Sequence, residues 1–80
     1  MILQPGKLYK LNEGKIFYSD PECSKHVFEW ILKSRQIILL LIGESELINQ
    51  KHMKKVKILT GTGIVGWICY PKYTEIFSEL

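Results

Sequence analysis

Four residues are of the types that bind zinc: Cys23, His26, His52 and Cys69. A zinc site needs four nitrogen or sulfur donors that converge on one point, and its usual sequence signal is two pairs of closely spaced ligands. Here only Cys23 and His26 form such a pair. We therefore expect buried thiols and surface histidines, with no metal and no cofactor.

Cys23 and His26 are also the nearest approach to a nucleophile and its base. A catalytic dyad needs a third group that orients the base, and a pocket that holds the substrate. The sequence offers no evident third group, and a chain of 80 residues has little room for a pocket. We expect that the protein is not an enzyme.

Basic residues gather in one short segment, which contains Lys51, His52, Lys54, Lys55 and Lys57. If this segment is a strand, Lys55 and Lys57 project from one face, and together with Lys54 they could contact phosphate groups. No aromatic residue lies beside these lysines in the sequence to stack on bases. The alternative is a solvated strand edge whose lysines prevent pairing with another chain. We favour this alternative and rank a nucleic-acid or ribonucleoprotein partner second.

The composition is that of one globular domain spanning residues 1–80. Hydrophobic residues make up 46% and charged residues 24%, and the formal net charge is +3, which is less basic than most nucleic-acid binders. The longest apolar run, Ile37–Ile42, is far shorter than the roughly 20 residues of a membrane-spanning helix. The first residues do not resemble a secretory signal. We expect a cytoplasmic protein (in the host cytoplasm if it is viral), with reduced cysteines and no membrane partner.

The clearest structural element is a hairpin over residues 56–70. Thr60-Gly61-Thr62-Gly63 separates two runs of β-branched and apolar residues, and glycines adopt the positive φ that short hairpin loops require. In the second run Ile64, Gly66 and Ile68 share one face, which we expect to point inward. A glycine at such a position indicates close approach of another chain segment.

The remaining segments predict short strands joined by turns. A first hairpin has strands over 8–11 and 15–18, and Asp20-Pro21 then looks like the start of a single helical turn. The run from Val27 to Leu32 fits either a strand or a helix that begins at Pro21, and we favour the strand. Ile37–Ile42 is a strand that ends at Gly43, 45–51 is a loop, 52–59 opens the main hairpin, and the tail after Pro71 adds a turn and a last strand. The predicted fold class is all-β: a small barrel of five to seven short strands, with at most one helical turn.

Three segments resemble the SH3-like barrel family, in its bacterial or phage form. Gly63-Ile64-Val65-Gly66-Trp67-Ile68 is similar to the Gly-x-x-Gly-Trp-Ile strand of these domains, and residues 31–40 are similar to the segment that enters their second strand. Phe17-Tyr18-Ser19-Asp20-Pro21 resembles a loop of bacterial SH3 domains. The resemblance covers nearly the whole chain. Residues 56–66 also weakly resemble the RNA-associated KOW motif.

The resemblance implies a non-catalytic module that binds a partner protein or peptide. By analogy with SH3 folds, aromatic rings from the first hairpin and the end of the chain meet over one face, and acidic side chains border it. The rings are Tyr9, Tyr18, Trp67, Tyr70 and Tyr73, and the acidic rim is Asp20, Glu22 and Glu29. The alternative for the same rings is closure of the barrel ends.

A proline-rich ligand does not follow from the resemblance. Family members that bind such peptides carry an Ala-Leu-Tyr-Asp-Tyr motif, where this chain has Lys7-Leu8-Tyr9-Lys10-Leu11, with one tyrosine. They also carry a tryptophan that opens the third strand, where this chain has His52-Met53-Lys54. Stacking on a polyproline helix needs these rings in order.

The strand Ile37–Ile42 predicts self-association. Alternation sends three of its apolar side chains to each face of the sheet, and a small barrel has one core. By the analogy with SH3 strands we assign Ile38, Leu40 and Ile42 to the core, which leaves Ile37, Leu39 and Leu41 outside as an apolar patch. We expect a homodimer through this patch, and the alternative is that the loop 45–51 folds back over it.

Overall fold

The computed structural model describes residues 2–24, 26–48 and 50–80, and for residues 26–30 only the backbone. Within these residues the chain is all-β, as predicted. Seven antiparallel strands form one sheet in the order β3-β2-β6-β5-β4-β1-β7. Their bounds are β1 Leu8–Leu11, β2 Lys15–Tyr18, β3 His26–Leu32, β4 Ile37–Leu47, β5 Gln50–Thr60, β6 Val65–Pro71 and β7 Phe77–Glu79.

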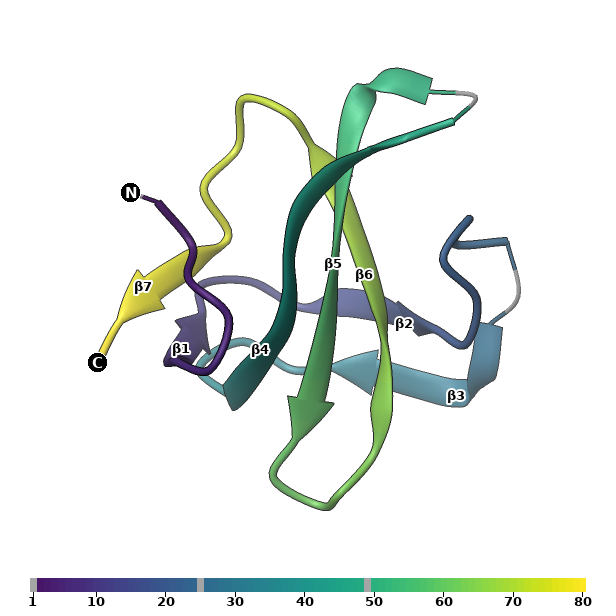
Figure 1. Ribbon diagram of the computed structural model, residues 1–80. Helices are drawn as coiled ribbons and strands as arrows, with labels where there is room; N and C mark the ends of the chain where they lie inside the picture. The colour runs from purple at the N-terminus through teal and green to yellow at the C-terminus, as the bar shows by residue number, and fades with distance from the viewer. Residues whose placement is uncertain (1, 25, 49) are drawn as a thin grey trace.

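The sheet curls into half of a barrel. Strands β4, β5 and β6 run down the front of Figure 1, β2 and β3 cross behind them, and β1 and β7 lie at the left. The curl gives the sheet an inner face, which holds the core, and an outer face. No helix among the described residues is long and apolar enough to cross a membrane.

The prediction of a helical turn at Pro21 is wrong, although Asp20 does cap a non-helical turn there. The Cys23 amide donates to the Asp20 carbonyl at 3.0 Å, and the Ser24 amide donates to the Asp20 carboxylate at 3.1 Å. Cys23 then takes a φ of 55°, a left-handed conformation that cannot continue a right-handed helix. The chain enters β3 soon afterwards, so the strand favoured for Val27 to Leu32 is confirmed.

The long hairpin of β4 and β5 corrects two further predictions. β4 continues past Gly43 to Leu47 and β5 begins at Gln50, so the segments 45–47 and 50–51 belong to strands and not to a loop that folds back. Within β4, Leu40 faces Ile58 but Ile42 faces Lys57, which leaves Leu41 as the extra residue of a β-bulge. A bulge changes the phase of side-chain alternation. For this reason Ile42, expected in the core, is 45% exposed.

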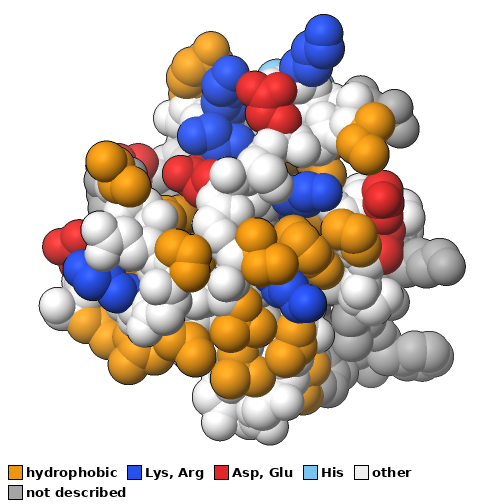
Figure 2. Space-filling view, viewed as in Figure 1, with side chains coloured by type: hydrophobic (Ala, Val, Ile, Leu, Met, Phe, Trp, Pro, Cys, Tyr) orange, Lys and Arg blue, Asp and Glu red, His pale blue; other side chains and the backbone are white. Residues whose placement is uncertain are grey.

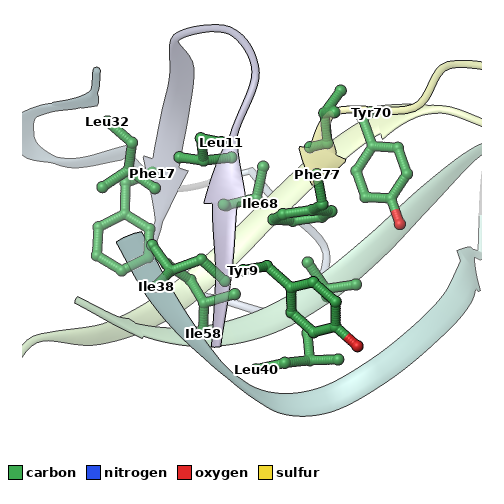
Figure 3. Close-up of a cluster of buried hydrophobic side chains, with 12 residues drawn as sticks. Tyr9, Leu11, Phe17, Leu32, Ile38, Leu40, Ile58, Ile68, Tyr70 and Phe77 are labelled. Carbon is green, nitrogen blue, oxygen red and sulfur yellow. The ribbon is translucent and has the colours of Figure 1, made fainter. Parts of the chain in front are cut away.

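The core occupies the inner face, and each of the seven strands contributes at least one described residue to it. Phe17 of β2, Ile38 and Leu40 of β4, Ile58 of β5 and Ile68 of β6 converge there (Figure 3). These fully buried aliphatic and aromatic side chains supply the main stabilisation that a sheet of this size has available. The outer face is therefore free to carry function.

Gly66 lies on the inner face, as predicted, at the point where β2 comes closest to β6. A Cβ atom built on Gly66 would lie 2.4 Å from the Phe17 ring and 2.7 Å from the Tyr18 carbonyl oxygen. No side chain fits at these distances. The glycine lets Phe17 pack directly against the backbone of β6.

Candidate interaction surface

The five predicted rings do not form one surface. Tyr9 and Tyr70 are 1% and 2% exposed and belong to the core, where their ring centroids lie 6.1 Å and 5.9 Å from that of Phe77. Tyr73 is 92% exposed, in the segment between β6 and β7. Only Tyr18 and Trp67 come together, as partners in register on β2 and β6.

The hydroxyls of the two core tyrosines are satisfied inside the protein. The Tyr9 hydroxyl accepts a hydrogen bond from the Gln4 amide at 2.8 Å. The Tyr70 hydroxyl donates to the Glu44 carboxylate, and burial first, then this bond and the charge of Glu44, raise the pKa of Tyr70. Tyr9 and Tyr70 thus belong to the core, and their hydroxyls have partners within the protein. Lys54, an expected phosphate contact, pairs with the same Glu44 at 3.5 Å.

Trp67 lies beside two lysines on the outer face. The Nζ atoms of Lys55 and Lys57 are 5.3 Å and 5.9 Å from the centroid of the Trp67 ring, within the range of cation–π attraction. The ring belongs to β6 and the lysines to β5, so a ring lies beside these lysines in space although none lies beside them in the sequence. Among the described side chains, no carboxylate forms an ion pair with Lys55 or Lys57.

A row of apolar side chains crosses four strands next to this cluster. In register, Leu8 of β1 faces Leu39 of β4, Leu39 faces Leu59 of β5, and Leu59 faces Val65 of β6. Leu8 and Val65 are 52% and 46% exposed, and the two between them are half-buried. We call these four residues the apolar row. Figure 2 shows hydrophobic side chains gathered over the lower part of β4, β5 and β6, around a lysine or arginine.

The residues expected to mediate self-association lie in or beside the apolar row. Leu39 is one of its members, and Ile37 is exposed next to it, where both line a shallow recess with Leu8 and Leu59. Leu41, at the bulge, is half-buried. The exposed Ile42 extends the apolar surface toward Lys57, its partner in register.

A cluster of sulfur and phenol groups borders Trp67 on its other side. Cys69 is two residues beyond Trp67 on β6, and it contributes to the raised pKa of both Cys23 and Tyr18. Burial first, and then Cys69, raise the pKa of the Cys23 thiol to about 12. Burial is also the main cause of a raised pKa at Tyr18. Both cysteines are free and half-buried.

The acidic rim and the zinc ligands do not assemble into a site in the described residues. The Asp20 carboxylate is engaged by Ser24, whose hydroxyl donates to it at 2.6 Å, and Glu22 is exposed. The side chains of Glu29 and His26 lie outside the described residues. No group of three histidine, cysteine or acidic side chains gathers in the described part of the chain.

Comparison with family models, with curated proteins and with solved structures found no match to this chain.

Sequence reasoning missed the apolar row and the contact between Trp67 and the lysines. Both follow from the register of β5 on β6, in which Lys57 faces Trp67 and Leu59 faces Val65. Counting outward from the glycine-containing turn would have given this register, because turn geometry sets the register of a hairpin. No local signal shows that Cys69 affects the pKa of Cys23, because the two residues lie in a turn and a strand far apart in the chain.

Proposed function

We propose that the chain is a non-catalytic, cytoplasmic protein-interaction module that binds its partner with the outer face of the sheet. The observation that carries this proposal is the apolar row, in which four aliphatic side chains cross four strands without a polar residue between them. A contiguous apolar patch on the surface of a small domain usually marks an interaction site. The SH3-like resemblance of the sequence agrees with a binding role.

The surroundings of the apolar row suit a protein partner. Interfaces combine an apolar centre with a polar rim, and tryptophan is among the residues that contribute most to binding energy. Trp67 and Lys57 form the next pair on the same face of the sheet as Leu59 and Val65, two residues along each strand. The partner best suited to this surface presents aliphatic side chains with carboxylates at their edge, which would meet Lys55 and Lys57.

The cysteine cluster supports a non-catalytic role. The reactive form of a cysteine nucleophile is the thiolate, and the pKa of the Cys23 thiol is raised to about 12. Cys23 therefore keeps its proton at neutral pH.

The test is binding by variants that add charge to the outer face. Val65→Glu introduces a carboxylate into the apolar row, and Ile48→Glu is the matched control, because Ile48 is exposed at the turn at the far end of the β4–β5 hairpin. Partners are captured from cells of the native source, identified by mass spectrometry, and titrated as purified proteins. We expect Val65→Glu to weaken binding about tenfold or more and Ile48→Glu to leave it unchanged. Equal binding by both folded variants would contradict the proposal.

Nucleic-acid binding is the second candidate, and the contact of Trp67 with Lys55 and Lys57 favours it. Single-strand binders stack bases on aromatic rings and neutralise phosphates with nearby cations. The test is fluorescence anisotropy of labelled single-stranded DNA and RNA at low and physiological salt, with wild type, Trp67→Ala and the double variant Lys55→Ala/Lys57→Ala. Binding that persists at physiological salt and is lost in both variants would favour this function over the first. No binding by the wild type would exclude it.

A further inference from the structure

Three residues of β5 form a line along the outer face of the sheet. Val56 and Ile58 are fully buried on the inner face, so Leu59, Lys57 and Lys55, which alternate with them, point outward. The pairing of β5 with β6 is regular over this stretch, and successive outward positions on a strand lie about 7 Å apart. The line therefore presents one apolar position followed by two ammonium groups at equal spacing.

The apolar end of this line borders the recess beside the apolar row. The recess has a volume of about 300 Å³, which is at the small end of the range for ligand sites and leaves room for one large side chain. Its wall is mostly aliphatic, so it suits an apolar side chain and not a charged one. The residues that line it are Leu8, Ile37, Leu39, Leu59, Thr60 and Gly61.

The two lysines lie among apolar neighbours. Lys57 faces Ile42 on one side and Trp67 on the other, and the Nζ atoms of Lys55 and Lys57 are 5.3 Å and 5.9 Å from the centroid of the same Trp67 ring. Neither lysine forms an ion pair with a carboxylate among the described side chains. Apolar surroundings reduce screening by water, so a carboxylate that reaches these lysines is held more strongly than at a fully solvated lysine.

We propose that the outer face binds an extended acidic segment of another protein. One large apolar side chain of the segment enters the recess, and carboxylates two and four residues along pair with Lys57 and Lys55. An extended segment has the same two-residue repeat as β5, whereas one face of an α-helix advances only about 5.4 Å per turn. This inference rests on the proposed function of the outer face as a protein-binding surface, and it names the kind of segment that the surface takes.

A second copy of the chain fits the two lysines less well than an acidic segment does. Glu13, Glu44 and Glu46 each form an ion pair with a lysine of their own chain, so a second copy cannot offer these carboxylates without breaking those pairs. The net charge of +3 also makes two copies repel each other. A second copy can cover the apolar row, but an acidic segment satisfies both the row and the charges of Lys55 and Lys57.

The experiment compares three fluorescently labelled peptides by anisotropy, with the purified protein as titrant at low salt. The acidic peptide carries leucine, serine, glutamate, serine and glutamate in this order, the neutral peptide has glutamine in place of glutamate, and the shuffled peptide has both glutamates directly after leucine. We expect the acidic peptide to bind about tenfold or more tightly than the neutral one, because two ion pairs are gained. This difference should shrink at high salt, and the shuffled peptide should bind more weakly than the acidic one. A competing second copy of the chain would weaken all three alike, so the ratios of affinities are unaffected.

Equal affinity of the acidic and neutral peptides, or no binding of the acidic peptide, would overturn the inference. A shuffled peptide that binds as tightly as the acidic one would overturn the extended arrangement. Equal binding of acidic and neutral peptides that is lost in Val65→Glu would overturn this inference alone, because the apolar row would still be a binding surface. The proposed function fails separately, if Val65→Glu leaves the binding of the captured partner unchanged.

A charge exchange assigns the preference to the two lysines. The folded variant Lys55→Glu/Lys57→Glu should lose the preference for the acidic peptide and prefer one with lysines in place of the glutamates. The matched control is Lys33→Glu/Lys51→Glu, which has the same net charge and changes two exposed lysines away from the line; it should keep the preference for the acidic peptide. If circular dichroism shows that the exchanged variant does not fold, Lys55→Gln/Lys57→Gln gives the same test through loss of the preference. A folded variant that still prefers the acidic peptide as strongly as wild type would overturn the proposal.

Discussion

The substitution Gly66→Ala tests the closest packing contact in the fold. The added Cβ would lie 2.4 Å and 2.5 Å from two carbons of the Phe17 ring and 2.7 Å from the Tyr18 carbonyl oxygen. Ordinary contacts of this kind lie at about 3.5–4.0 Å, so the neighbours must move by about 1 Å. Phe17 is fully buried and the carbonyl is backbone, so neither can move alone. Overpacking of this kind costs about 1–3 kcal/mol, and we expect the free energy of unfolding in urea to fall by that amount.

A matched control and a double mutant separate this explanation from a general effect of replacing glycine. A Cβ atom at Gly61, in the turn between β5 and β6, would meet nothing within 4 Å, so Gly61→Ala should change stability by less than about 0.5 kcal/mol. Phe17→Leu removes part of the ring that the new Cβ would strike. In the Phe17→Leu background, Gly66→Ala should therefore cost clearly less than it does alone. An unchanged stability of Gly66→Ala, or costs that simply add in the double mutant, would refute the packing argument.

Three further predictions concern Tyr70, Cys23 and the apolar row. Tyr70→Phe removes the hydrogen bond to Glu44 and should lower the free energy of unfolding by about 0.5–1.5 kcal/mol, and a loss near zero in urea titration would show that this bond contributes nothing. Burial raises the pKa of Cys23 from 9.0 to about 12, so the unfolded chain loses this proton at a lower pH than the folded protein does. The contribution of this group to the free energy of unfolding is therefore fully present below pH 9.0 and falls as the pH rises toward 12. Urea midpoints at neutral and alkaline pH should show this fall in wild type and a smaller one in Cys23→Ser, whereas equal falls would remove Cys23 as its cause. For the apolar row, we expect light scattering to give twice the monomer mass for wild type at micromolar concentration and the monomer mass for folded Leu39→Glu, and a wild type that stays monomeric when concentrated would exclude a second copy of the chain as the partner.

Much of the fold could be predicted from local signals in the sequence. The glycines between the runs of the main hairpin mark its turn, and the alternation of Val56 and Ile58 with the lysines marks which face is inward. Gly66 was expected to lie where another chain segment approaches, and Phe17 fills that place. These features depend on residues near one another in the chain, and for this reason the sequence alone reveals them.

The errors arise where distant parts of the chain decide the outcome. Tyr9 and Tyr70 could be buried because the Gln4 amide and Glu44 satisfy their hydroxyls, and neither partner could be identified before the fold was known. Trp67 meets Lys55 and Lys57 only through the pairing of two strands. The sequence therefore shows which residue types are present but not which of them lie together on one face.

The bulge at Leu41 means that β4 could lose one residue at this position and still pair with β5. Because Leu40 faces Ile58 and Ile42 faces Lys57, a chain lacking Leu41 would pair these same residues in an unbroken ladder. Leu40 would still point inward and Ile42 outward, so a one-residue deletion there would not exchange the two faces. What the deletion would remove is the local bend that a bulge gives its strand. Inserting or deleting one residue at this position can thus change the curvature of the outer face, and with it the surface shape that a partner meets. The residues of the core would stay the same.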